Sequence, residues 1–548
     1  MKSLSIAIAL KLALVSSSAV AVPSEGSHIM TAGASPYAVQ IARDISLKGG
    51  NAVDAAVAIA LSLAVTHPYY AAFGGGGFAM VKVDSRIEAL DFREKAPLKA
   101  KPEMYESKPV AASRTGGLAI GVPGVAAGLW ELHHRYGHLK WNALFTAAID
   151  LAEGGFRVSG EWVKNTNSTG TRFNDAGLKF FFKSKAEPYK PGELLKQPAL
   201  GKFLRQYRTQ GPDIFYKGTF AKELIDVSNA TGGILSLEDL SAYNVRWLTP
   251  LQTQFNGYRV SLMPPPSSGG VLAIEALKLM EKLKLSDNAF LSIDEYHKLI
   301  EILKLSYHGR AQLGDPEMSH LPIDQLTGDS YISSLAAMFK PDHALDTEKV
   351  PELNFEKEET THLSVMDAAG NAVAMTITLN GDYGSGVVTP KTGIALNNEM
   401  DDFTTHIGKP NMFGLIQGQA NTVRASARPL SSMTPTIVEK DGRTVLAVGA
   451  PGGPRITSAV IQVLYRILGQ NLEVDHAIQT PRVHHQFTPN SVKYDEFRFT
   501  PETLAGLKAK GHVLETGSTA RVSGVFRAAD GVLQGACDSR GECAAGGY

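Results

Sequence analysis

The chain has 548 residues and a mass of 58.7 kDa, which is enough for one large or two ordinary domains. Hydrophobic residues make up 44% of it and charged residues 20%, and 54 basic residues balance 54 acidic ones. This composition is globular. The zero net charge, without a long basic or acidic run, argues against nucleic acid and anionic membranes as partners.

Residues 1–21 have the pattern of a secretory signal peptide. Lys2 gives a positive start, the stretch 4–15 is mostly apolar, and residues 19–21 (Ala-Val-Ala) match a small-x-small cleavage site. Lys11 interrupts the apolar run, so a buried N-terminal helix is the alternative. No other stretch reaches 18 uncharged apolar residues, and we expect an exported mature protein, periplasmic or secreted, without a membrane span.

Two helices and two strands are predicted next. The first helix runs from Ser35-Pro36 to about Lys48, with proline at its first position. The stretch 51–65 is rich in alanine and apolar nearly all round, which predicts a deeply buried helix. Four glycines at 74–77 lack the Lys-Ser/Thr of a phosphate-binding loop. Strands are predicted at 78–83 and 87–92.

The next third of the chain shows little chemistry. Arg93 stands at the end of a strand that should be buried, where a lone arginine is usually part of a structural ion pair. A helix is predicted from the Gly121–Gly124 turn to about Tyr136, and residues 140–345 alternate helical stretches and turns. Residues 346–359 are charged and poor in apolar side chains, which predicts an exposed segment. The histidines interpreted as structural are His133, His134, His138 and His308.

Residues 360–380 are predicted to form a β-hairpin. Asp367 to Asn371 carries the turn chemistry, and both flanks alternate between apolar and polar residues. A three-residue loop would pair Asp367 with Asn371, whereas a slip by one residue would mix the two faces. The apolar pairs in this register are Leu363 with Met375 and Val365 with Val373.

The opposite face of the hairpin is polar. Its members are Thr360, His362, Ser364, Ala374, Thr376 and Thr378. Thr360 lies opposite Thr378, with their Cβ atoms roughly 5 Å apart, whereas Thr361 turns to the apolar face. Threonine suits strands, so a purely structural role is one interpretation of this pair.

Several later segments are polar or rich in glycine. Residues 399–402 (Glu-Met-Asp-Asp) hold three acids, which would usually form a solvated turn, since the spacing of an EF-hand is absent. Gly449–Gly453 reads as a turn into a helix from Ile456. Cys537 and Cys543 are the only cysteines. They form either a small disulfide loop or two free thiols, and their spacing is not a four-ligand metal pattern.

The hairpin, with Tyr383-Gly384 after it, resembles the signature of the bacterial γ-glutamyltransferases (glutathione hydrolases). Residues 404–418 resemble the lid loop of the bacterial members. Phe413 stands where a tyrosine is expected, and its missing hydroxyl predicts looser lid closure. The other matching segments are 49–97 with its Asp-x-Arg-Glu sequence, 263–270, 428–436, 449–453, 481–486 and 544–548.

The resemblance implies an N-terminal-nucleophile hydrolase that is made as one precursor. The chain would cut itself between Glu359 and Thr360, giving a large subunit, 22–359, and a small subunit, 360–548. Thr360 would be the nucleophile, and its newly freed α-amine the base. Such an amine titrates near pH ~8, so it can accept a proton at neutral pH. Thr378 would orient the Thr360 hydroxyl.

The resemblance also implies the other site residues. Gly452 and Gly453 would form the oxyanion hole. Arg93, with Ser431 and Ser432, would bind the α-carboxylate of the substrate, because a guanidinium suits a bidentate grip. The residues implied to bind the α-ammonium are Asn380, Glu399 and Asp402. Some relatives carry glutamine at the position of Glu399.

The implied fold class is α+β, an αββα sandwich with two central antiparallel sheets built from both products. The implied substrates are glutathione and other γ-glutamyl amides, with water, amino acids or peptides as acceptors, and no cofactor or metal. Two alternatives remain. A glutaryl-type β-lactam acylase of the same fold would have no ammonium to bind, so Glu399 and Asp402 argue against it. A non-catalytic periplasmic binding protein would not need the intact Thr360, Thr378 and glycine set.

Overall fold

A computed structural model describes residues 23–347 and 358–548. The predicted signal peptide, 1–21, lies outside the described residues, as does most of the predicted exposed segment 346–359. Within the described part of the chain, no helix is both long enough and apolar enough to span a membrane.

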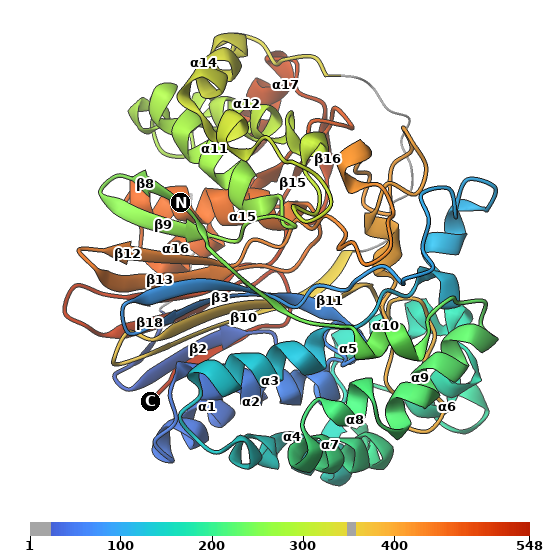
Figure 1. Cartoon of the computed structure of the whole chain (residues 1–548). Helices are drawn as coiled ribbons and strands as arrows, with labels where there is room; N and C mark the ends of the chain where they lie inside the picture. The colour runs from blue at the N-terminus through green and yellow to red at the C-terminus, as the bar shows by residue number, and fades with distance from the viewer. Residues whose placement is uncertain (1–22, 348–357) are drawn as a thin grey trace, which may run out of the picture.

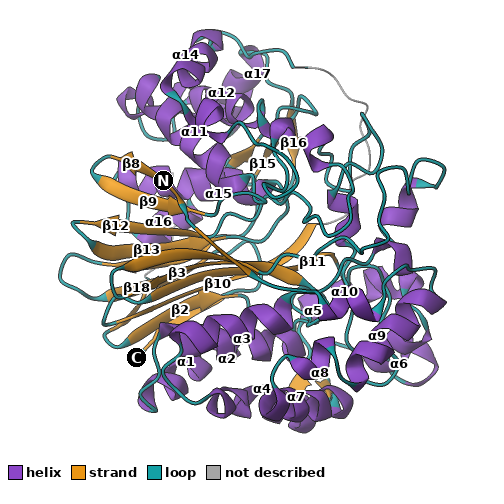
Figure 2. Cartoon of the chain, in the orientation of Figure 1, coloured by secondary structure: helices purple, strands orange, loops and turns teal. Residues whose placement is uncertain are grey.

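Two antiparallel sheets lie at the centre of the molecule, and helices cover both outer faces (Figures 1 and 2). In the described residues each sheet has seven strands. In order, sheet A consists of β1 (Ser24–Gly26), β18 (Leu533–Cys537), β17 (Ser523–Arg527), β13 (Arg443–Gly449), β12 (Thr436–Lys440), β9 (Tyr258–Leu262) and β8 (Leu251–Phe255). Sheet B consists of β19 (Ala544–Gly547), β2 (Ile29–Gly33), β10 (Glu358–Asp367), β11 (Ala372–Gly381), β3 (Gly76–Val83), β4 (Arg86–Asp91) and β7 (Arg246–Leu248).

One helical layer packs on the outer face of sheet B, with α1, α2 and α3 directly against its strands (Figure 1). The helices of this half are α1 (Tyr37–Leu47), α2 (Ala52–Thr66), α3 (Val125–Tyr136), α4 (Thr146–Gly154), α5 (Gly160–Thr169), α6 (Asp175–Phe181), α7 (Pro198–Gln210), α8 (Asp213–Tyr216), α9 (Thr219–Ala230) and α10 (Leu237–Ser241). All residues of α2 are buried, as its composition predicts. Asn51 caps it by accepting hydrogen bonds from Val53 N and Asp54 N.

The second helical layer covers sheet A. Its helices are α11 (Gly269–Lys282), α12 (Ile293–Tyr307), α13 (Ile323–Thr327), α14 (Asp329–Met338), α15 (Arg455–Leu464), α16 (Val474–Gln479) and α17 (Pro501–Ala509). The short strands outside the two sheets are β5 (Phe156–Arg157), β6 (Leu194–Leu195), β14 (Val483–His484), β15 (Val492–Tyr494) and β16 (Leu514–Thr516). The layer order αββα confirms the predicted fold class.

The predicted hairpin is β10 and β11, at the centre of sheet B, and its register is confirmed. Leu363 pairs with Met375 and Val365 with Val373, and these four side chains join the core beneath α2. Asp367 N donates to Asn371 O (3.0 Å), which closes the predicted three-residue loop. The Asp367 carboxylate also accepts a hydrogen bond from Ala52 N (3.1 Å), so the hairpin turn docks on the first turn of α2.

The structure shows the state of the two cysteines and the role of the glycine run 74–77. Cys537 and Cys543 form a disulfide. The four glycines at 74–77 allow close packing of backbones, because an added Cβ would lie 2.1 Å from Ala395 O at Gly74 and 2.1 Å from Thr378 O at Gly75. This run therefore lets β3 and the chain before it approach β11, which carries Thr378.

Candidate active site

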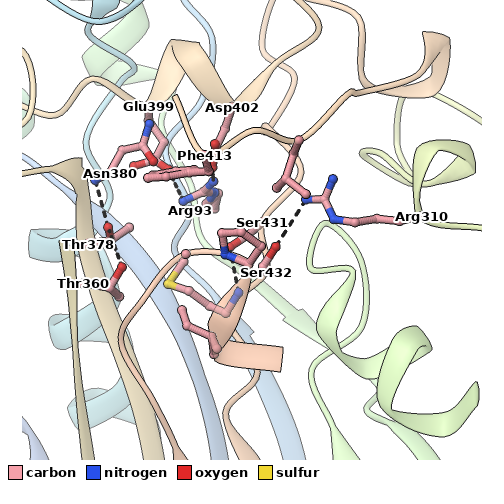
Figure 3. Close-up of a pocket in the computed structure, with 15 residues that line it drawn as sticks. Arg93, Arg310, Thr360, Thr378, Asn380, Glu399, Asp402, Phe413, Ser431 and Ser432 are labelled. Carbon is pink, nitrogen blue, oxygen red and sulfur yellow. Dashed lines mark hydrogen bonds and ion pairs between the residues drawn. The ribbon is translucent and has the colours of Figure 1, made fainter. Parts of the chain in front are cut away.

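The two threonines of the hairpin face each other as predicted. Thr360 pairs with Thr378 in the strand register, and their hydroxyl oxygens are 3.4 Å apart (Figure 3). Thr378 Oγ1 also accepts a hydrogen bond from Asn380 N (2.8 Å), which fixes its position. Thr361 pairs with Ile377, whose side chain lies in the core beneath α2, so Thr361 points away from Thr360.

The strand ladder is irregular at the predicted cleavage bond. Glu358 pairs with Gly381 and Thr360 with Thr378, and the register shifts between these two pairs. A bulge of this kind releases one residue from regular pairing and is common beside active sites. Leu379 and Asn380 of β11 stand against the single residue Glu359, so the extra residue lies in β11, opposite the predicted scissile bond, and Asn380 has a positive φ of 77°.

A pocket lies beside Thr360 and Thr378 (Figure 3). Every residue assigned to the site by resemblance, apart from Gly452 and Glu359, contributes to its wall. The lining residues are Arg93, Arg310, Thr360, Thr378, Asn380, Glu399, Asp402, Phe413, Leu415, Ser431, Ser432, Met433, Gly453, Pro454 and Ile456. They come from both sides of the predicted cut, because only Arg93 and Arg310 precede Thr360.

Arg93 follows β4 and is buried, with its guanidinium between the carboxylates of Glu399 and Asp402. Its Nη1 forms an ion pair with Glu399, and its Nη2 lies 2.6 Å from Asp402 Oδ2. Glu94 Oε2 is 3.8 Å from Nη1. In the folded chain Arg93 is therefore already neutralised by acidic neighbours.

The carboxyl groups around Arg93 are crowded. Burial raises the pKa of Glu94 to about 7 and the pKa of Glu399 well above its usual range, although the charge of Arg93 opposes both shifts. Burial also raises the pKa of Asp402, again against Arg93. Crowding three carboxyl groups around one guanidinium in a buried site therefore disfavours the simultaneous ionisation of all three.

The serine pair lies on the opposite wall of the pocket. Ser431 and Ser432 precede β12, and the sequence gives no sign of what supports them. The structure shows that Arg310 does so in part, because its Nη2 donates to Ser432 Oγ (3.3 Å; Figure 3). Arg310 lies in a short 3₁₀ turn, Arg310–Gln312, after α12. The sequence interpretation missed it, since nothing in the surrounding residues distinguishes it from a surface arginine.

Gly452 and Gly453 adopt positive φ angles of 130° and 55° in the turn before α15. These angles favour glycine, and a Cβ at Gly452 would lie 3.0 Å from that of Ala520. Within residues 23–347 and 358–548, no hydrogen-bond acceptor is found for the backbone N–H of either glycine. Gly453 lines the pocket, whereas Gly452 does not.

The segment 404–418 that resembles a lid covers the acidic turn. Asn411 Nδ2 donates to Asp402 Oδ1 (3.0 Å), and Met412 N donates to Asp401 Oδ2 (2.8 Å). Phe413 is buried against the pocket without a tyrosine hydroxyl. The contacts to the two aspartates fasten the segment, and looser closure from the missing hydroxyl stays a prediction.

One group outside the pocket has the residue types of a metal site. His297 and Glu301 of α12 are buried together with His512. Lys304 Nζ lies 2.8 Å from Glu301 Oε1, and His297 Nδ1 is 2.8 Å from His512 Nε2. The lysine already balances the carboxylate, and the two histidines bond to each other, so this cluster is explained by its own contacts.

Comparison with known proteins identifies the family. A family model described as Gamma-glutamyltranspeptidase matches residues 38–548. The chain is 39% identical over 528 residues to a glutathione hydrolase proenzyme of Escherichia coli (strain K12), covering 93% of this chain and 90% of that protein. The crystal structure of Helicobacter pylori gamma-glutamyltranspeptidase is 36% identical, with a TM-score of 0.55 over 57% of this chain and 91% of that one. A cephalosporin acylase from Bacillus halodurans, 24% identical, shares the fold with a TM-score of 0.84 over 96% of this chain and 97% of that one. The chain belongs to the gamma-glutamyltranspeptidase family.

Proposed function

We propose that the pocket beside Thr360 is the active site of a self-processing gamma-glutamyltransferase and glutathione hydrolase. The observation that carries this proposal is the Thr360–Thr378 pair at the wall of a pocket that contains both arginine and buried carboxyl groups. A γ-glutamyl group carries an ammonium and a carboxylate on one carbon, so its binding site needs both signs of charge. Curated relatives named glutathione hydrolase proenzyme support the same activity.

Maturation uses the Thr360 hydroxyl. Its oxygen attacks the carbonyl carbon of Glu359, the peptide C–N bond breaks, and the nitrogen takes up a proton to become the α-amine of Thr360. The product is an ester between the Glu359 acyl group and Thr360 Oγ1. Water then hydrolyses this ester and leaves a carboxylate on Glu359 and a free hydroxyl on Thr360. The bulge in β11 lies opposite Glu359, so the strand ladder is irregular at the bond that this attack breaks.

Turnover uses the same hydroxyl on the γ-carbonyl of the donor. The α-amine of Thr360 accepts the hydroxyl proton and passes it to the leaving amine. The backbone N–H groups of Gly452 and Gly453 stabilise the oxyanion, a contribution of roughly 3–4 kcal/mol per donor. The acyl-enzyme is then released to water, or to the amine of an amino acid or peptide.

Donor binding exchanges ion pairs inside the pocket. The α-ammonium of the donor is received by Asp402 and Glu399 with Asn380. The α-carboxylate in turn takes the place of those acids at Arg93 and bonds the serine pair. In this arrangement the ammonium replaces Arg93 at the acids, and the carboxylate replaces the acids at Arg93.

The proposed location of this activity is outside the cytosol, in the periplasm or the medium. The predicted signal peptide motivates it, and the Cys537–Cys543 disulfide supports it, since disulfides persist in oxidising compartments outside the cytosol. The large and small products would remain together as a heterodimer.

The acylase alternative is favoured by the shared fold of the cephalosporin acylase, but that likeness concerns the fold alone. A glutaryl side chain has a carboxylate and no ammonium. The two carboxyl residues that line the pocket, Glu399 and Asp402, would then face a substrate without an ammonium, so the charge of this site favours the γ-glutamyl donor. The self-cleavage machinery likewise argues against a protein that only binds.

N-terminal sequencing of the purified protein should give two sequences. The smaller chain should begin Thr-Thr-His-Leu, because the Thr360 hydroxyl cuts the bond before it. The larger should begin at Val22, if the signal is removed after Ala21. A smaller chain that begins at Thr361, or an active enzyme of one uncut chain, would contradict the proposal.

Replacing Arg93 with lysine should raise KM for a γ-glutamyl anilide by about tenfold or more. Lysine keeps the charge but loses the fork that the carboxylate grips. The same change at Arg135, an arginine paired with Glu88 on the surface, is the matched control and should leave KM unaltered. Steady-state kinetics of both variants decides, and an equal KM for Arg93→Lys and the native enzyme rules out Arg93 as the carboxylate ligand.

A further inference from the structure

Arg310 is a buried cation whose hydrogen-bond partners, among the described residues, are all neutral. Only 4% of its surface is exposed. Its Nε donates to Ser268 Oγ (3.2 Å), its Nη1 to Gln417 Oε1 (2.8 Å) and its Nη2 to Ser432 Oγ (3.3 Å). No carboxylate of the described chain forms an ion pair with it. Burial lowers the pKa of Arg310 to about 10, which still leaves it charged at neutral pH.

The two arginines of the pocket therefore differ in charge balance. Arg93 is flanked by Glu399, Asp402 and Glu94, whereas Arg310 faces hydroxyl and amide oxygens. A buried charge without an opposite partner is costly, and such residues are kept where a ligand supplies the partner. Both side chains line the same pocket, on the two sides of the serine pair (Figure 3).

The hydrogen bonds of the two serines show where such a ligand would bind. Ser431 Oγ accepts from Met433 N (3.1 Å), and Ser432 Oγ accepts from Arg310. In the part of the chain that the structure describes, neither hydroxyl donates to a protein acceptor. Because each serine oxygen already accepts a hydrogen bond from the protein, the hydroxyl hydrogen of each serine remains available to a ligand. Asp402 attracts Arg310 from beyond ion-pair distance, so two adjacent O–H donors beside a guanidinium without an ion pair make a site for a carboxylate.

We propose that Arg310 is a positioning residue of the α-carboxylate site, which it serves in two ways. Its hydrogen bond to Ser432 Oγ directs the hydroxyl hydrogen of Ser432 towards the α-carboxylate of the γ-glutamyl substrate. Its charge also attracts the carboxylate, which enters a pocket that already holds Glu399 and Asp402. This inference rests on the proposed function, because the ligand is the α-carboxylate of a γ-glutamyl donor.

A purely structural role is the competing explanation. Through Gln417, whose Nε2 donates to Asp402 O (3.0 Å), Arg310 also ties the segment 404–418 to the acidic turn. If that tie were its whole purpose, loss of Arg310 would impair every donor alike, whether or not the donor has a carboxylate. The two roles therefore predict different substrate dependence.

The test compares two donors, γ-L-glutamyl-p-nitroanilide and the same compound with its α-carboxylate converted to a carboxamide. Arg310→Gln should raise KM for the first by at least about tenfold, as expected for loss of a charged hydrogen-bonding group. KM for the carboxamide, and kcat for both donors, should change by less than about threefold. Arg310→Lys should recover part of the loss, because it keeps the charge. Gln417→Ala, which removes the tie but not the cation, should not show the selective rise.

Maturation of each variant is checked first on a denaturing gel. If Arg310→Gln does not fold or mature, Arg310→Lys decides the question with the same pair of donors, together with Ser432→Ala. In the double variant that combines Arg310→Lys with Ser432→Ala the two effects should not add, since one residue acts through the other. An equal loss for both donors, or additive effects, overturns the inference. A native enzyme that turns over neither donor would instead refute the proposed function.

Discussion

Replacing Thr360 with alanine should leave the chain uncut and lower γ-glutamyl transfer by at least about 10⁴-fold. The hydroxyl is needed twice, first to attack the Glu359 carbonyl and then to attack the donor. Without the first attack the α-amine that serves as base does not form, so nucleophile and base are lost together. A denaturing gel should show a single chain, and the anilide assay should show no release above background.

Two variants serve as controls for this result. Thr361→Ala removes a hydroxyl next in sequence that points to the core beneath α2, so the chain should still be cut at the same bond. Thr360→Ser keeps a hydroxyl and should also mature. A Thr360→Ala protein that appears as two chains, or that retains activity as one, would show that another group performs the attack.

Replacing Asp402 with asparagine should lower kcat/KM for γ-glutamyl amides by at least about 30-fold. Truncating one partner of a buried charge pair costs roughly 2–5 kcal/mol, and the low end of that range corresponds to this factor. Asp402 bonds Arg93 and Asn411, so its carboxylate is held in position for an ammonium. Steady-state kinetics with a γ-glutamyl and a glutaryl anilide measures the effect.

The glutaryl anilide is the control substrate, since it has the same chain without the ammonium. It should lose little or even gain, because one negative charge leaves the pocket. Glu399→Gln is the control variant. Burial and neighbouring carboxyl groups raise the pKa of Glu399, which disfavours its charged form, so the change to neutral glutamine should have an effect that is several-fold smaller. If Asp402→Asn lowers kcat/KM for both substrates by the same factor, Asp402 does not bind the ammonium, and the acylase interpretation is favoured.

The sequence predicts two parts of this site. One is the local hairpin geometry, and the other is the set of residues implied by the family resemblance. Alternation around Asp367–Asn371 fixes the register, and that register places Thr360 against Thr378. Resemblance supplied Arg93 and the serine pair. The pocket that joins them depends on tertiary packing, because Arg93 and Ser431 are 338 positions apart in the chain (431 − 93) and no periodicity links them.

Arg310 could not be predicted for the same reason. Its neighbours carry no motif, and its burial follows from the packing of the turn after α12 against Ser268 and Gln417. The disulfide was equally open, since the spacing of Cys537 and Cys543 permits either state. The order of strands in the two sheets also lay beyond the sequence, since β19 pairs with β2 from the opposite end of the chain.

Sheet B alternates strands from before and after the predicted cut, which bears on whether folding or cleavage comes first. β2 precedes the predicted cut in the chain. It is hydrogen-bonded on its two sides to β10 and β19, which both lie after the cut. β11 in turn pairs with β3, again across the cut. Each half alone would have unpaired strand edges, which promote aggregation. Under the proposed mechanism Thr360 attacks only once it faces Thr378, so the cut would follow the formation of the hairpin at the centre of sheet B.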